Sequence, residues 1–184
     1  SNSMLSIEGY NVETDLRNDR TNTMNGIGGG ILVYTKHGLK IKPSTENNEL
    51  CQYVKFYVLS GNNAEPLTIY VIYRSPNSSE INNERLNDLI SNVPDNSILV
   101  GDFNFPNIRW NETYAGGDLK GRRFLEKITE HELAQVIDFP THNKGNILDL
   151  VLTNNPQRVI SVEDIGNLGN SDHTTIMIEY DFQG

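Results

Sequence analysis

ILVGDFNFPN, residues 98–107, joins an unbroken apolar run to a group of polar side chains. The run with its flanks, residues 97–101, is short and continuously apolar, which is typical of a strand buried inside a layered fold. Asp102 and Asn104 follow it directly, two positions apart. Polar residues there either cap a turn, as in the common Asx turn, or take part in chemistry. Because strand alternation puts residues i and i+2 on one side, both side chains are expected to converge just beyond the strand.

Outward from this strand, the chain combines strand-like runs with two helical patterns. The first helix is expected over the apolar stripe of residues 86–93, with Ser79 as its N-cap, and the second over residues 124–128. Clustered strands with two inserted helices predict an α/β (α+β) layered fold and not a regular βαβ alternation. Strands are expected at residues 31–35, 39–42, 52–60, 66–73, 97–101, 146–153, 158–165 and 174–180.

Two predictions concern the first quarter of the chain. Lys36, His37 and Gly38 read as a turn between residues 31–35 and 39–42, which predicts a hairpin. The stretch before Asn25 is polar and weakly patterned, so we expect it to form loop.

The bulk composition is that of an ordinary globular chain. Its 184 residues, 36% of them hydrophobic, predict a single domain over residues 1–184. No apolar run approaches the roughly 20 residues of a membrane span, and no secretory signal is visible, so no membrane partner is expected. The single cysteine, Cys51, fits a reducing compartment, which predicts an intracellular protein, nuclear or cytoplasmic. The net charge of −9 argues against a protein that coats nucleic acid, but not against an enzyme whose carboxylates hold a cation.

Three further polar clusters lie at or near strand ends. Asp149 sits inside NILDLVLT, where an unpaired buried carboxylate would cost several kcal/mol, so it should have a partner such as a histidine. Ser171, Asp172 and His173 precede the last strand and form either a solvated turn or a site that brackets a metal or phosphate.

Residues 73–77 form the third of these clusters, at the end of a strand. Tyr73 and Arg74 are either a half-buried core tyrosine and a surface arginine or donors to a phosphate oxygen. Together the clusters match metal-assisted hydrolysis of a phosphate ester, in which hard oxygen ligands suit Mg²⁺ and a histidine serves as acid or base. From these clusters we assign Arg74, Asn77 and Ser171 to substrate binding.

The order of the motifs GGGILVY, IYRSPN, ILVGDFN, ILDLVLTN and SDH resembles the endonuclease/exonuclease/phosphatase superfamily. More narrowly, GDFNFPNIRW and NILDLVLTNNP resemble the apurinic-type endonuclease domain of non-LTR retrotransposon (endonuclease-reverse transcriptase) proteins. The resemblance runs from about Gly9 to Phe182. It implies a four-layer α/β/β/α sandwich, two sheets face to face with helices outside, that hydrolyses phosphodiesters with a divalent cation, Mg²⁺ or Mn²⁺, and it makes DNA the expected partner.

The resemblance also implies roles for the clustered residues. Asp102 would position or deprotonate the attacking water and contribute to the metal site, and Asn104 would hold a phosphate oxygen and help place Asp102. Tyr73 would contact the scissile phosphate. His173, oriented by Asp149, would stabilise or protonate charge at that phosphate. Asp172 would lie at the metal or water site.

The amino-terminal end departs from the family pattern. The family opens with a strand bearing an asparagine and a second strand that ends in a metal-binding glutamate, and neither precedes SIEGYNV here; residues 1–3 read as an expression remnant. We therefore expect the fold to lack its first strands, and Mg²⁺ binding and activity to be impaired. Uncovered strand edges predict a homodimer, a swapped segment or a rearranged amino-terminal stretch.

Three functions stay open at the level of sequence. The first is a Mg²⁺-dependent DNA-nicking endonuclease, the second an inactive remnant that acts as a binding module, and the third a phosphatase for small substrates. Basic residues gathered around Asp102 and His173 would favour DNA, whereas scattered ones would favour the other two functions. The basic residues concerned are Arg17, Arg20, Lys36, Lys40, Lys42, Lys120, Arg122 and Arg123.

Overall fold

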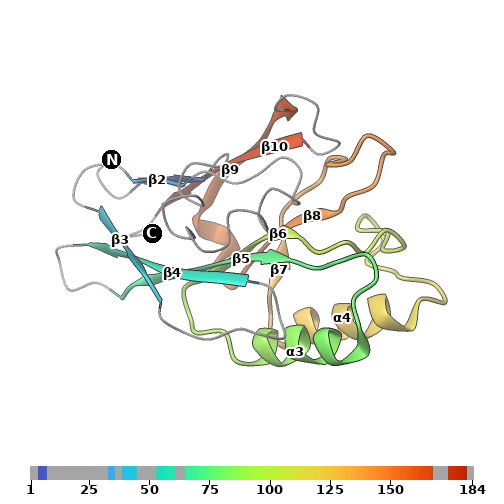
Figure 1. Cartoon of the computed structure of the whole chain (residues 1–184). Coiled ribbons are helices and arrows are strands. Elements are labelled where there is room, and N and C mark those ends of the chain that lie inside the picture. The colour runs from blue at the N-terminus through green and yellow to red at the C-terminus, as the bar shows by residue number, and fades with distance from the viewer. Residues whose placement is uncertain are drawn as a thin grey trace.

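The computed structural model describes residues 4–7, 33–35, 39–44, 53–60, 65–167 and 174–181. Its strands form two sheets (Figure 1). The first has the order β2-β1-β10-β9, from β1 (Met4–Ile7), β2 (Val33–Thr35), β9 (Val159–Asn167) and β10 (Thr174–Asp181). The second has the order β3-β4-β5-β6-β8-β7, from β3 (Leu39–Pro43), β4 (Tyr53–Ser60), β5 (Leu67–Tyr73), β6 (Ser97–Asp102), β7 (Ala134–Gln135) and β8 (Asp149–Thr153).

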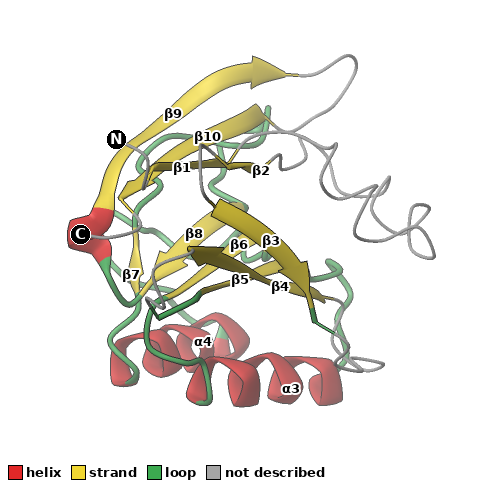
Figure 2. Cartoon of the chain, turned by 90° about the vertical axis from the view of Figure 1, so that its left-hand side faces the viewer, coloured by secondary structure: helices red, strands yellow, loops and turns green. Residues whose placement is uncertain are grey.

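The elements stack in layers, as Figure 2 shows. The two sheets lie face to face, and helices α3 (Glu80–Ser91) and α4 (Leu119–Glu130) cover the outer face of the six-stranded sheet. A short 3₁₀ helix, η2 (Pro156–Arg158), connects β8 to β9. This arrangement confirms the predicted α/β sandwich; within the described ranges, helices cover only one of the two sheets.

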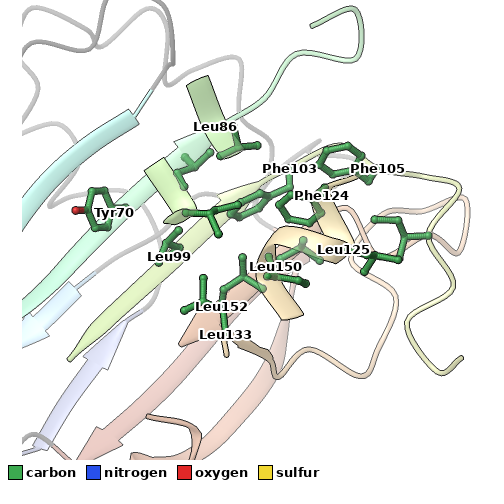
Figure 3. Packing of buried hydrophobic residues seen from close by; sticks show 14 of the residues in the cluster. Tyr70, Leu86, Leu99, Phe103, Phe105, Phe124, Leu125, Leu133, Leu150 and Leu152 are labelled. Carbon is green, nitrogen blue, oxygen red and sulfur yellow. The ribbon is translucent and has the colours of Figure 1, made fainter. Parts of the chain in front are cut away.

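Two apolar clusters hold the layers together. One fills the space between the sheets and contains Val100 of β6, Val151 of β8 and Ile178 of β10. The other lies between the six-stranded sheet and the helices, where Leu99 and Leu150 meet helical and loop side chains (Figure 3). Residues of β6 therefore alternate between the two clusters, which is why its sequence reads as an unbroken apolar run.

Both long helices begin at side-chain caps. The Ser79 hydroxyl accepts from the backbone N–H of Asn82 over 3.2 Å, which confirms the predicted cap of α3. Asp118 caps α4 by accepting from the backbone N–H of Gly121 over 3.3 Å. Each cap satisfies a backbone donor that has no partner inside its helix.

Two local predictions were wrong. The strands on either side of Lys36, His37 and Gly38 do not form a hairpin, because β2 pairs with β1 and β3 pairs with β4 in the other sheet. Part of the expected amino-terminal loop is β1, which pairs with both β10 and β2. The partners of β1 come from distant parts of the chain, which a local pattern does not specify.

A polar contact ties the two sheets together at the end where β6 begins. The hydroxyl of Tyr180, on β10, donates to Oδ1 of Asn96 over 3.0 Å. Asn96 precedes β6, and its Nδ2 donates to the carbonyl of Pro66 over 3.2 Å. Asp102 lies at the opposite end of β6 from this contact.

Candidate active site

The register of the central strands brings three of the predicted site residues into one row. Tyr73 of β5 is the parallel partner of Asp102 of β6, and Asp102 is the antiparallel partner of Asp149 of β8. The preceding row on the same face is apolar and belongs to the core between the sheets. The row of Tyr73, Asp102 and Asp149 thus ends that core, on the face of the six-stranded sheet that looks toward β10.

The row is polar but largely withdrawn from solvent. Asp102 and Asp149 are 4% and 6% exposed, and Tyr73 is half-buried and packs against the core between the sheets. Burial raises the pKa of the Tyr73 phenol, and the negative charge of Asp102 raises it further. The Tyr73 hydroxyl therefore keeps its proton at neutral pH and can donate a hydrogen bond to an anionic oxygen.

Gly101 allows β6 and β5 to run close together just before the row. Its φ is +138°, and a Cβ built on it would lie 1.9 Å from the carbonyl oxygen of Ile72. Real Cβ atoms do not approach another atom that closely, so only glycine fits at this point of the ladder. The glycine of GDFN is thus a packing requirement that places Asp102.

Asn104 lies in the turn that follows β6. Its φ is +53°, a left-handed conformation that asparagine tolerates better than most residues. The turn is held by backbone bonds, since the N–H groups of Phe103 and Asn104 donate to the carbonyl of Leu148 over 2.9 and 3.4 Å. Asn104 therefore shapes a turn at the site, next to the segment that leads into Asp149.

Arg74 lies on the other face of the sheet from the row. Its guanidinium is stacked over the ring of Phe105, with 3.9 Å between Cζ and the ring centroid, and contacts Asn83 of α3. The predicted contact of Arg74 with substrate has no support in this geometry. Asn77, by contrast, is exposed in the turn that follows β5, and its assignment to substrate stays a prediction.

Thr141 is a residue that the sequence analysis missed. Its hydroxyl accepts from the backbone N–H groups of Leu148 and Asp149 over 2.9 and 3.0 Å, and its carbonyl accepts from the N–H of Thr174 over 2.8 Å. One buried threonine thus connects the start of β8 to the start of β10. No local signal marks it, because its partners lie 7 to 33 positions away.

The remaining predicted residues, Ser171, Asp172 and His173, lie outside the described residues. The described site therefore consists of the row, the Asn104 turn and Thr141. Its carboxylate oxygens are the kind of ligand that Mg²⁺ prefers, and Mg²⁺ sites use only one or two protein carboxylates. Nowhere in the described ranges do three or more His, Cys, Asp or Glu side chains form a metal-binding group.

Of the basic residues considered from the sequence, the four whose side chains are described do not gather at the row. Lys120, Arg122 and Arg123 are exposed on α4, which covers the face of the sheet opposite the row. Lys42 is exposed on β3, at the far edge of the sheet from β8. The other basic residues considered from the sequence have side chains outside the described residues. No helix in the described part is long and apolar enough to cross a membrane.

Comparisons with known proteins fit this fold and site. A family model described as Endonuclease-reverse transcriptase matches residues 67–177, which span the row and the Asn104 turn. No curated protein matches the chain. The endonuclease domain of TRAS1, a telomere-specific non-LTR retrotransposon, has a TM-score of 0.62 and 17% identity, over 84% of this chain and 72% of that one.

Two further solved structures share the fold. The AP endonuclease LMAP from Leishmania major has a TM-score of 0.55 and 12% identity, over 81% of this chain and 65% of that one. An endonuclease/exonuclease/phosphatase family protein from Bacteroides thetaiotaomicron has a TM-score of 0.50 and 10% identity, over 83% and 71%. The predicted resemblance to this superfamily is confirmed.

Proposed function

Because this chain belongs to the endonuclease-reverse transcriptase family, we propose that it is a divalent-metal-dependent phosphodiester hydrolase that nicks DNA as the endonuclease domain of a retrotransposon-type protein. Residues 1–184 would form one such domain. The observation that carries the proposal is the row of Tyr73, Asp102 and Asp149 across three neighbouring strands. Two carboxylates and a phenol on one face can provide a general base, a group that orients a general acid, and a hydrogen-bond donor to the phosphate, which are functions used in hydrolysis of a phosphate diester.

Each member of the row would have its own task. Asp102 accepts the proton of the attacking water, and the protonated Tyr73 hydroxyl donates to an oxygen of the scissile phosphate. Asp149 orients His173, which supplies a proton to the leaving oxygen. The hydrogen bond between Thr141 and Thr174 supports this last pairing, because Thr174 follows His173 and Thr141 holds Asp149.

The residues present fit a hard cation. Asp102 and, from outside the described residues, Asp172 would hold Mg²⁺ or Mn²⁺ through their carboxylate oxygens. A bound divalent ion would neutralise charge that develops on the phosphate. Asn104, at the turn beside Asp102, would hold a phosphate oxygen and keep it in place during attack.

A second candidate function is hydrolysis of a small phosphate ester. The observation in its favour is electrostatic: the chain carries a net charge of −9, and the described basic side chains of α4 lie on the face opposite the row. A long DNA backbone gains affinity from neighbouring cations, whereas a small ester depends on the site itself. An inactive binding module remains the third outcome of the test below.

The test is a plasmid-nicking assay with Mg²⁺ or Mn²⁺, run beside release of phosphate from small phosphomonoesters. The chain, its Asp102→Asn variant and a longer chain with residues encoded upstream of Met4 are compared. Asp95→Asn is the matched control, because Asp95 is an exposed aspartate in the turn before β6. We expect weak metal-dependent nicking that the longer chain strengthens, that Asp102→Asn abolishes and that Asp95→Asn retains. Phosphate release without nicking would favour the second function, and neither activity in any chain would contradict both.

A further inference from the structure

Arg74 is a buried cation directly behind the candidate site. Its side chain follows the last residue of β5 and points to the helical side of the sheet, where the residue is only 8% exposed. Burial lowers the pKa of its guanidinium, and the nearby charges of Asp118 and Asp102 oppose that effect. Removing the guanidinium from water costs free energy that packing alone does not offset, so its hydrogen bonds must explain its position.

The contacts of Arg74 converge on the turn that carries Asn104. Nη1 donates to the carbonyl oxygen of Asn104 over 2.7 Å and to that of Phe103 over 3.3 Å. The backbone N–H of Arg74 also donates to the carbonyl of Asp102 over 2.8 Å. Three successive carbonyls of the site loop are thus held by one residue, at the point where Asn104 adopts its left-handed φ of +53°.

The far end of the guanidinium is anchored on α3. Nε donates to Oδ1 of Asn83 over 2.9 Å. The Nδ2 of Asn83 is buried, and no described residue accepts a hydrogen bond from it. Turning the amide over would bring this NH₂ group against the guanidinium, which has no acceptor, so the charged contact fixes the amide orientation. The Phe105 ring below Arg74 packs in turn on Phe124 of α4, 4.4 Å between centroids (Figure 3).

We infer that Arg74 is a positioning residue: its guanidinium connects Asn83 of α3 to the carbonyls of Phe103 and Asn104, and thereby fixes the turn that presents Asp102 and Asn104. The inference rests on the proposed function for its effect on activity, and on the contacts alone for its effect on the turn. Lysine does not replace arginine here, because one ammonium cannot reach both Asn83 and Asn104 in a fixed fork geometry.

Kinetics separate positioning from direct binding of phosphate. Arg74→Lys keeps the charge and loses the fork, so we expect kcat for nicking to fall about 10²-fold, the order that a displacement of about 1 Å produces, with KM within a few fold. Arg74→Met should leave the salt dependence of DNA binding unchanged. A lower salt slope by about 1, with a raised KM, would instead show a phosphate contact and overturn the inference.

Asn83 offers a matched pair of variants. Asn83→Asp keeps an acceptor for Nε and removes the buried unpaired donor, so nicking should stay within a few fold of the wild type. Asn83→Leu has a similar volume but no acceptor, and it should lower kcat about tenfold. Arg85→Lys, on the exposed side of the same helix, is the control for an arginine of α3 and should change nothing.

An NMR measurement tests the effect of Arg74 on the turn separately from its effect on nicking activity. Backbone amide NMR signals of Phe103 and Asn104 should move in Arg74→Lys and Asn83→Leu and stay in place in Arg85→Lys and Asn83→Asp. If the wild-type chain does not nick DNA, the proposed function fails while these signals still decide the role of Arg74. Unmoved signals in Arg74→Lys, or a kcat equal to that of Arg85→Lys, would overturn the inference.

Discussion

Asp102 and Asp149 face each other directly across the antiparallel ladder of β6 and β8. Both are buried, and residues opposed in this way hold their Cβ atoms roughly 4.5–5.5 Å apart. Like charges at that separation repel each other unless a proton, a hydrogen-bond donor or a cation compensates. The fold therefore places two carboxyl groups side by side at one end of its central core, where a bound cation would compensate their charge.

Divalent cations should stabilise the folded chain through Asp102. At an ion concentration about ten times the dissociation constant, binding adds about 1.4 kcal/mol, or roughly 3–6 °C in the unfolding midpoint for a chain of this size. Thermal unfolding with and without Mg²⁺ or Mn²⁺ measures the shift. The shift should vanish in Asp102→Asn and persist in Asp95→Asn; an equal shift in all three chains would place the ion elsewhere.

Replacing Gly101 by alanine should destabilise the fold by about 3 kcal/mol, because the new Cβ overlaps the Ile72 carbonyl and the backbone has a positive φ. Gly145→Ala is the matched control, since its φ is +87° but nothing lies within 4 Å of an added Cβ. It should cost only about 1 kcal/mol. Denaturant unfolding, followed by fluorescence of the single tryptophan Trp110, measures both. Equal losses of stability in the two variants would mean that the positive φ causes the destabilisation and the overlap with the Ile72 carbonyl does not.

Thr141→Val should disturb Asp149 specifically. Valine has the shape of threonine but leaves the buried N–H groups of Leu148 and Asp149 without their acceptor, at a cost of about 1–3 kcal/mol for each unpaired donor. Thr141→Ser keeps the hydroxyl and should stay near wild type. Unfolding curves and nicking rates of the pair provide the measurement. A stable and fully active Thr141→Val chain would show that Asp149 is held by other contacts.

The ionisation of Tyr73 should occur above the usual 10.0 of tyrosine, because burial and Asp102 both raise its pKa. A pKa that is higher in the folded state means a stabilising contribution that is complete below pH 10 and lost as the pH rises through the folded-state value. Absorbance of tyrosinate in the wild type and Tyr73→Phe identifies this group. In Asp102→Asn the pKa should move back toward 10.0, and no movement would mean that the two side chains do not interact.

Local patterns were sufficient where structure depends on near neighbours. The continuous apolar run before Gly101 predicted a central strand, and the Ser79 cap and the apolar stripe behind it predicted α3. These features depend on backbone donors within one turn and on burial of both strand faces. The ordered motifs, from IYRSPN to ILDLVLTN, were likewise enough to indicate the family and its sandwich fold.

Side-chain placement at the site needed more than pattern. Tyr73 and Arg74 are adjacent, and the sequence offered both as phosphate donors. The structure separates them, because a strand sends neighbouring side chains to opposite faces and the helical face is filled by α3 and Phe105. Which face of a strand is exposed depends on how the layers pack, and the local sequence pattern does not specify this.

By itself the sequence therefore determined most of the strand and helix runs, the Ser79 cap that begins α3, and the set of polar residues at strand ends. Only the tertiary structure decided that β2 and β3 belong to different sheets, that Tyr73, Asp102 and Asp149 stand in one row, and that Thr141 and Arg74 form hydrogen bonds to the backbone beside it. The physical reason is the distance along the chain over which each kind of interaction acts. Propensity and capping act over a few residues, whereas strand register and burial are set by contacts between segments tens of residues apart.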